Sequence, residues 1–302
     1  MKYIMLDLEW DSAYYPPEKQ FINQILQIGA VKLNERLEII DTFEETIRSD
    51  FSKRVTGRFA KLTGITSEIM RNGIPLHEAV KRYNEWAGKD TITMTWSDSD
   101  LYSIKRNEEM LLHDQLHFAI ERYLDLQKFV QGEMRLTGYT DKNQISLAGA
   151  AEYFGIDTED LVLHTAGDDS RLSVALLKHC YQPERFAALV RDTADPEFYK
   201  RLRFKPYPLS NIKDPLIQKE KLIFQCDRCG QTAARCNAWK YHNRWFAANF
   251  KCPACGRKFN GRVSFIKTYD NVKVRRKICE CKPKKRTVVE KQDDVQSVPE
   301  KV

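Results

Sequence analysis

The chain has 302 residues, of which 42% are hydrophobic and 30% are charged, and this length allows one sizeable core plus a small module. No apolar run reaches the roughly 18 residues that a membrane span needs. The apolar run at residues 3–6 is too short for a signal peptide and leads directly into Asp7. We therefore expect a cytoplasmic protein whose cysteines stay reduced.

Charge is unevenly distributed along the sequence. Residues 201–302 contain 25 Lys and Arg against 9 Asp and Glu, whereas residues 1–200 contain 24 against 33. An acidic part joined to a basic part suggests that one carries the chemistry and the other binds a polyanion. A basic surface that is merely solvated is the alternative.

In chain order, the patterns first predict three strands, at residues 2–8, 25–33 and 38–44, with a hairpin turn at residues 34–36. Thr66 is a candidate helix N-cap, residues 76–86 are predicted as a helix, and residues 91–96 as a short strand. Residues 105–130 are predicted to be helical and then strand-like at 123–129, and two further helices are predicted at residues 146–154 and 169–179. Strands alternating with helices after a meander predict an α/β domain with a mixed sheet.

The composition changes along the chain and predicts four parts. These are an α/β domain at residues 1–183, a linker with a helical start at 184–220, a cysteine-rich module at 221–282 and a disordered charged tail at 283–302. The linker is marked by four prolines within twenty residues, at positions 196, 206, 208 and 215.

Asp7 and Glu9 end the first predicted strand and are spaced by two, so both side chains leave the same face. Two adjacent carboxylates repel each other unless a cation lies between them, and hard oxygen ligands suit Mg²⁺ or Mn²⁺. The alternative is a solvated acidic pair on an edge strand. The apolar residues before Asp7 favour a central strand instead.

Two further segments carry candidate residues. Asp100 lies between a strand and a helix, where it could reach the same site or, like Asp98, could be a helix N-cap. His164 precedes Asp169 by five residues, and the alternative there is a surface histidine beside a capping acid. Helical periodicity alone does not separate Asp168 from Asp169.

In this order the segments resemble the DnaQ-like superfamily of DEDDh 3′–5′ exonucleases. The resemblance rests on three motifs: Asp-x-Glu, an aromatic residue four before an Asp, and His-x₄-Asp. They match Asp7 with Glu9, Trp96 with Asp100, and His164 with Asp169. Ser97 departs from the second motif, which usually has Gly there. The resemblance covers residues 1–182, selects Asp169 over Asp168, and implies an RNase H-like mixed sheet flanked by helices.

The resemblance also implies catalytic roles for these residues in a two-metal hydrolysis. Asp7, Glu9 and Asp169 would bind one Mg²⁺ or Mn²⁺ ion with the attacking water, and Asp7 with Asp100 would bind a second ion at the leaving oxygen. His164 would take the proton from the water, because an imidazole titrates near working pH.

The substrate is less well specified than the reaction. Residues 62–66 and 84–86 look most like the exoribonuclease branch that includes KapD-like proteins and trimmers of small-RNA and histone-mRNA 3′ ends. We therefore expect single-stranded 3′ ends as the partner, with RNA favoured. The alternatives are a DNA 3′–5′ exonuclease and a non-catalytic nucleic-acid-binding protein on a nuclease scaffold.

The C-terminal module contains two C-x-x-C-G knuckles separated by 22 residues. Their cysteines are Cys226, Cys229, Cys252 and Cys255. This spacing predicts one tetrahedral Zn²⁺ site in a zinc ribbon, and disulfides or free thiols are the alternative. The remaining cysteines, Cys180, Cys236, Cys279 and Cys281, are expected to be unpaired, although a second metal site with His242 remains open.

Aromatic and cationic residues alternate between the two knuckles. Interleaving of this kind is typical of single-strand platforms, where bases stack and phosphates pair with cations. The candidates for nucleic-acid binding are Trp239, Lys240, Tyr241, Arg244 and Trp245. The alternatives are that these aromatics form the core of the ribbon and that the ribbon binds a protein partner.

Overall fold

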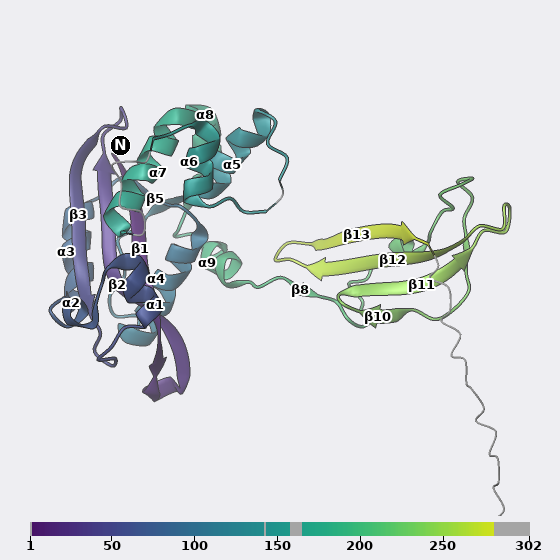
Figure 1. The fold of residues 1–302 in the computed structure, drawn as a ribbon, viewed down its shortest axis with the longest axis horizontal. Helices are drawn as coiled ribbons and strands as arrows, with labels where there is room; N and C mark the ends of the chain where they lie inside the picture. Colours follow the sequence, from purple (N-terminus) through teal and green to yellow (C-terminus); the bar gives the residue numbers. More distant parts are fainter. Residues whose placement is uncertain (1, 142, 158–164, 281–302) are drawn as a thin grey trace, which may run out of the picture. The chain divides into compact units, whose positions relative to one another are not determined.

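The computed structural model describes residues 2–141, 143–157 and 165–280 (Figure 1). These residues form two compact units, the first ending at Arg203 and the second beginning at Phe204. None of the helices in these ranges is both long enough and apolar enough to cross a lipid bilayer.

The first unit is built on a seven-stranded sheet. Its strands are β1 (Lys2–Tyr15), β2 (Gln20–Leu33), β3 (Ile39–Arg48), β4 (Ile74–Pro75), β5 (Thr91–Thr95), β6 (Arg122–Asp125) and β7 (Arg191–Asp192). They lie in the order β4-β3-β2-β1-β5-β6-β7 (Figure 1). The first three form an antiparallel meander, whereas β5 is parallel to β1 and β6 is parallel to β5. The predicted mixed sheet is therefore confirmed.

Helices cover both faces of this sheet. The α-helices described are α1 (Gly57–Thr63), α2 (Ser67–Arg71), α3 (Leu76–Ala87), α4 (Asp98–Leu111), α5 (Leu126–Leu136), α6 (Leu147–Phe154), α7 (Ala166–Cys180), α8 (Pro183–Leu189) and α9 (Pro196–Arg203). Tyr3 and Met5 of β1 pack in a core cluster with α5 and α7. The alternating residues Ile4 and Leu6 pack in a second cluster with α3 and α4. This alternation follows from the period of two in a strand.

The strand-like prediction for residues 123–129 is wrong beyond Asp125. The β6 strand ends there, and the Asp125 side chain caps α5 by accepting a hydrogen bond from the Lys128 N–H at 2.9 Å. Phe129, Val130 and Met134 are buried on one side of this helix. Their spacing fits a helix, but a short apolar run cannot be assigned from periodicity alone.

The predicted start of the linker, residues 184–203, packs on the first unit. It contains α8, β7 and α9, and β7 pairs antiparallel with β6. Phe186 is buried in the cluster that contains α5, and the ring of Phe198 lies 5.9 Å from that of Tyr123. Apolar contacts of this kind hold the segment against the sheet.

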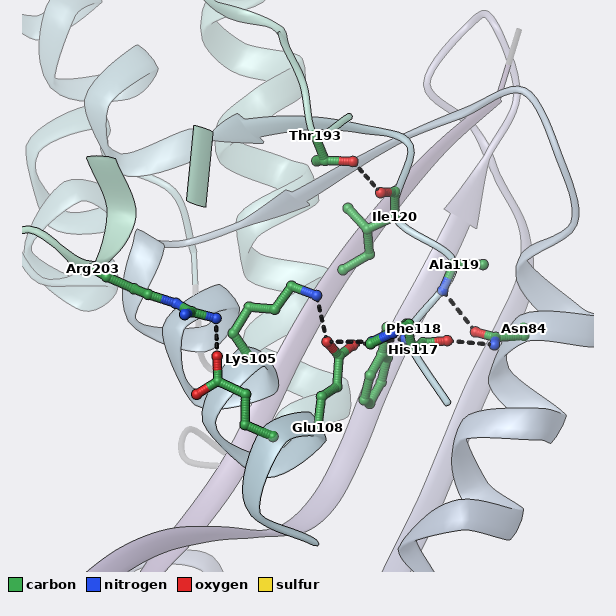
Figure 2. A network of polar contacts seen from close by, with 10 residues as sticks. Asn84, Lys105, Glu108, His117, Phe118, Ala119, Ile120, Thr193 and Arg203 are labelled. Atoms are coloured by element: carbon green, nitrogen blue, oxygen red, sulfur yellow. Dashed lines mark hydrogen bonds and ion pairs between the residues drawn. The ribbon is translucent and has the colours of Figure 1, made fainter. Parts of the chain in front are cut away.

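A polar network fixes the segment between α4 and β6 (Figure 2). The Glu108 carboxylate is 1% exposed and accepts hydrogen bonds from the Lys105 ammonium at 2.5 Å and the Phe118 N–H at 2.8 Å. Asn84 on α3 accepts from the Ala119 N–H at 2.7 Å. A buried carboxylate is tolerated only when it is paired in this way. The network therefore sets where the chain enters β6.

The second unit is an antiparallel β structure around an aromatic core. Its strands are β8 (Tyr207–Pro208), β9 (Ala234–Arg235), β10 (Lys240–His242), β11 (Trp245–Lys251), β12 (Lys258–Lys267) and β13 (Val272–Cys279), and β10 to β13 lie side by side in sequence order (Figure 1). Phe224 and Phe250 are in the core, where a Cβ at Gly261 would lie 2.8 Å from the Phe250 ring. Glycine at this position lets the rings pack on the strand.

Candidate functional site

Two carboxylates stand on the sheet face that α7 covers. Asp7 and Glu9 follow Met5 at intervals of two along β1, so the three side chains leave the same face. The β1–β2 register shifts between Glu9 and Trp10, which ends the regular alternation directly after the second carboxylate. The pair is on a central strand, because β1 lies between β2 and β5, and it follows directly after the segment of β1 that pairs with β5.

The start of α7 packs directly on β2 at Gly29, which is the register partner of Asp7. A Cβ at Gly29 would lie 2.4 Å from the carbonyl carbon of Ala166 and 2.6 Å from the backbone nitrogen of Gly167. The Ser170 hydroxyl donates a hydrogen bond to the Gly29 carbonyl at 3.2 Å. Only glycine permits this approach, which brings the first turn of α7 to the carboxylates of β1.

Asp169 in that first turn completes a three-carboxylate cluster. Asp7, Glu9 and Asp169 each offer an oxygen, and the three oxygens lie within 4.8 Å of one another. Asp168 instead forms an ion pair with Arg171 at 2.8 Å. The choice between Asp168 and Asp169 that periodicity left open is thus made by the position of the helix.

Asp100 reaches the same region from the first turn of α4. Its side chain is buried, with 4% exposure, and its charge contributes to raising the pKa of Asp7. It lies outside the three-carboxylate cluster. The N-cap of α4 is Ser97, whose hydroxyl accepts from the Ser99 N–H at 3.3 Å. The alternative that Asp98 or Asp100 is the cap is therefore wrong.

Burial and mutual repulsion disfavour the charged forms of these carboxyls. Burial, with a contribution from Asp169, raises the pKa of Glu9 to about 7. Burial also raises the pKa of Asp100 to about 8, although hydrogen bonds from backbone groups oppose the shift. The pKa of Asp7 lies well above its usual range because of burial and then of the neighbouring Asp100. A bound cation would relieve this repulsion.

The donor set fits a hard divalent cation. Carboxylate oxygens are the ligands that Mg²⁺ and Mn²⁺ prefer, and adjacent ligands of one octahedral ion are about 3 Å apart. The three oxygens are already grouped within 4.8 Å, so small side-chain adjustments would bring them into range. Asp7, Glu9 and Asp169 can therefore hold such an ion, with Asp100 next to them.

His164 lies outside the described residues. The next residue, Thr165, is described and is the N-cap of α7, where its hydroxyl accepts from the Asp168 N–H at 3.3 Å. The part assigned to His164 therefore stays a prediction from its place in the sequence.

Two polar residues beside the start of α7 were not identified from the sequence. The Gln27 side chain donates a hydrogen bond to Glu44 at 3.0 Å and accepts a long one from the Ala166 N–H at 3.5 Å. Both come from neighbouring strands, so no linear motif reveals them. Asp11, a further acid near the first motif, accepts from the Thr56 N–H at 2.6 Å and holds the start of α1.

The four knuckle cysteines form a second candidate metal centre. Their sulfur atoms all lie within 4.8 Å of one another. Cys226 and Cys255 are 3.6 Å apart at sulfur, and Cys229 and Cys252 are 3.4 Å apart. A disulfide would need about 2 Å, whereas four thiolates around one Zn²⁺ are about 3.8 Å apart. The geometry thus fits a tetrahedral metal site and not disulfides.

The remaining cysteines do not extend this centre. Among the residues described, Cys236, Cys279 and His242 belong to no group that could hold a metal. Cys180 is buried on the core side of α7, and Cys281 lies outside the described residues.

The five candidate nucleic-acid-binding residues do not form one surface: they are divided between the two sides of the ribbon sheet and the turn between β10 and β11, which contains Arg244. Trp239 packs against Phe224 and Phe250, with ring centroids 6.3 and 5.8 Å apart. Tyr241 is the register partner of Phe246, and its ring contacts Phe246 at 5.0 Å, on the core side. The other candidates are not part of that aromatic core: Lys240, Arg244 and Trp245.

Residues 18–177 match the exonuclease family, which is more than half of the chain. The chain therefore belongs to the exonuclease family, whose members hydrolyse phosphodiester bonds, and membership implies dependence on divalent metal ions. The matched segment begins after Asp7 and Glu9 and includes Asp169. In the structure, Asp7 and Glu9 lie next to Asp169.

Curated relatives include DNA polymerases of the PolC type. The chain is 23% identical over 213 residues to DNA polymerase III PolC-type of Clostridium perfringens, which covers 70% of the chain and 13% of that protein. It is 29% identical over 126 residues to the enzyme of Listeria monocytogenes, with 41% and 8% covered. The chain thus spans about an eighth or less of the length of these relatives.

Solved structures share the fold of the first unit. A full-length 3′-exonuclease is similar with a TM-score of 0.52 at 19% identity, covering 65% of this chain and 91% of that one. The nuclease domain of 3′hExo, a DEDDh family member bound to rAMP, is similar with a TM-score of 0.50 at 21% identity, and the match covers 59% of this chain and 90% of that one. Cell-death related nuclease 4 is similar with a TM-score of 0.51 at 19% identity, and the match covers 59% of this chain and 62% of that one. At these identities the likeness shows the fold.

In the absence of Mg²⁺ and Mn²⁺, the stability of the protein should fall as pH rises from about 5 to about 8. The raised pKa values of Glu9 and Asp100 mean that the folded state binds more protons than the unfolded state in this window. The slope should reach about 1.4 kcal/mol per pH unit at most for each group. Calorimetric melting at several pH values measures it, and saturating Mg²⁺ should flatten the profile. A melting temperature that rises with pH would contradict the prediction.

Gly29→Ala should displace the start of α7 from β2, because its Cβ has no room. We expect a destabilisation of about 1–3 kcal/mol in urea unfolding and weaker Mn²⁺ binding by calorimetry. Gly132→Ala on α5 is the matched control, since nothing lies within 4 Å of a Cβ there. Equal Mn²⁺ affinity in the two variants would show that the helix contact does not position the carboxylates.

The purified chain should contain one Zn²⁺, and Cys252→Ser should abolish it. Chelation should unfold the second unit, because a unit of this size depends on the metal for stability. The near-ultraviolet signal of its aromatic core should be lost while the helical signal of the first unit persists. Cys236→Ser is the control and should keep the zinc. Simultaneous loss of both signals on chelation would contradict the prediction.

Proposed function

We propose that the chain is a metal-dependent 3′–5′ exonuclease that shortens single strands from their 3′ ends. The observation that carries the proposal is the convergence of Asp7, Glu9 and Asp169 within 4.8 Å, with buried Asp100 adjacent, in a member of the exonuclease family. We assign the catalytic part to residues 1–183 and a zinc ribbon to residues 221–282.

In the proposed reaction, the oxygen of a water forms a new bond to phosphorus, and the bond to the 3′ oxygen of the preceding nucleotide breaks. Divalent ions, when bound, supply positive charge that favours ionisation of the water and stabilises the leaving oxygen. Asp7, Glu9 and Asp169 would hold these ions, and Asp100 would complete the site. Asp100 is buried and the other three carboxylates are partly buried, and this reduced contact with water strengthens their electrostatic attraction for a cation.

His164 is proposed as the general base that accepts the proton of the attacking water on a ring nitrogen. An imidazole ordinarily titrates near neutral pH, which is what a general base needs at that pH. The spacing to Asp169 places it just before α7, whose first turn carries that carboxylate. We also propose that Zn²⁺ binds Cys226, Cys229, Cys252 and Cys255 and stabilises the ribbon.

RNA is the proposed substrate, because the sequence resembles the exoribonuclease branch. Two of the similar structures concern RNA or its components: 3′hExo bound to rAMP, and a 3′-exonuclease that recognises a histone mRNA stem-loop. DNA is the second candidate, favoured by the similarity to PolC-type DNA polymerases. A protein without catalytic activity is the third, and the complete set of carboxylates argues against it.

Asp7→Asn should abolish hydrolysis, and His164→Ala should slow it by ~10²–10⁴. The measurement uses 5′-labelled single-stranded RNA and DNA side by side, with Mg²⁺ or Mn²⁺, and should show a ladder that shortens from the 3′ end. Asp168→Asn is the control, because Asp168 pairs with Arg171, and it should keep most of the activity. Shortening from the 5′ end, or full activity of Asp7→Asn, would refute the assignment.

A further inference from the structure

The face of the ribbon sheet that points away from the aromatic core is defined by the strand register. On the core side, Phe246 pairs with Val263 and Phe250 pairs with Phe259. Residues one position away point to the opposite side, because neighbouring side chains of a strand alternate. We call this opposite side the outer face; its members on β10 to β13 include Lys240, Trp245, Arg262, Lys273, Arg275 and Lys277.

The outer face is cationic across its full width. One row of register partners runs from Lys240 through Ala247 and Arg262 to Lys277. Arg275 follows two positions from Lys277 on the same side of β13. The strands β10, β11, β12 and β13 contain no Asp or Glu. The positive charge of the outer face is therefore not balanced by any acidic residue of these four strands.

Like charges face each other directly on this surface. Arg262 and Lys277 are register partners, and side chains so placed are about 5 Å apart at Cβ. Such a pair destabilises a sheet, and the described residues include no ion pair to Arg262, Arg275 or Lys277. A polyanion bound to this face would offset the repulsion, because its negative charges would attract the cations.

An aromatic ring lies among these cations. Trp245 is partly exposed, and the Lys277 ammonium lies 4.6 Å from the centre of its ring. An aromatic plane next to cations can stack a base while the cations contact the adjoining phosphates. Trp239 and Tyr241 are not part of the outer face, because their rings contact Phe224 and Phe246 on the opposite side of the sheet.

We propose that the outer face, with Trp245, Arg262, Arg275 and Lys277 at its centre, binds single-stranded nucleic acid at a site separate from the carboxylates. It deepens the proposed function by naming a second contact for the substrate strand. The phosphodiester backbone is the recognised feature, so RNA and DNA strands are both candidates. Binding at this face does not require hydrolysis or a 3′ end, so it can be tested apart from the exonuclease.

The test uses the full wild-type chain and covalently closed circular oligonucleotides of about 20 nucleotides, which offer no 3′ end. Fluorescently labelled oligouridylate and oligothymidylate circles are titrated at several salt concentrations. The triple variant Arg262→Gln, Arg275→Gln, Lys277→Gln, called the face variant, should bind more weakly. The salt slope is the slope of the logarithm of the binding constant against the logarithm of the salt concentration. Its magnitude should decrease by about 2 in the face variant, because three phosphate contacts are lost.

The matched control is Lys213→Gln, Lys219→Gln, Lys221→Gln, which removes the same charge from exposed or partly exposed residues before β9 and should leave the salt slope nearly unchanged. Zinc content and circular dichroism verify that both variants are folded. Equal weakening by both sets of substitutions would overturn the proposal, because it would indicate a general charge effect.

A second measurement tests the aromatic contact independently of charge. Trp245→Ala should weaken binding about five- to 100-fold, and Trp245→Phe should restore most of it, because phenylalanine also stacks with bases. Absence of salt-dependent binding to both circles would overturn the proposal. Binding of polyglutamate instead, lost in the face variant, would also overturn it and assign the surface to an acidic protein. Loss of activity on linear strands with normal circle binding would refute only the exonuclease assignment.

Discussion

The close contact between α7 and Gly29 is the constraint on which the candidate site depends. Without a side chain at position 29, the first turn of the helix reaches the strand and sets Asp169 beside Asp7 and Glu9. The carboxylates repel one another there, and their raised pKa values record that cost. A bound cation would relieve this repulsion, so a cluster of this kind favours binding of divalent cations. The contact of α7 with Gly29 therefore both packs the helix on the sheet and groups the candidate metal ligands.

The two units carry functional charge of opposite sign. The first concentrates partly buried acidic side chains at one point of a sheet, where divalent ions can bind. The second spreads positive charge over the outer face of a ribbon sheet, whose strands contain no acidic residue. A nucleic acid is compatible with both, since its phosphates can contact the cations directly and can approach the carboxylates only through metal ions.

Much of the fold was accessible from local patterns. The meander at residues 2–44, the helix at 76–86, the Thr66 cap and the later helices at 146–154 and 169–179 were predicted, because each has a clear period or cap. The strand-like prediction at 123–129 failed because the apolar run there is short and Asp125 starts a helix. The contacts of Gln27 with Glu44 join two strands and leave no linear signature.

The sequence by itself determined the residue types and their order: the acids of the three motifs, the two cysteine knuckles and the separation of charge between the two parts of the chain. Only the tertiary structure decided that Asp169 meets Asp7 and Glu9 in one cluster, that Ser97 and not an aspartate caps α4, and which aromatics of the ribbon face its core. The physical reason is that side-chain direction depends on register and helix position, which are set by packing between distant segments.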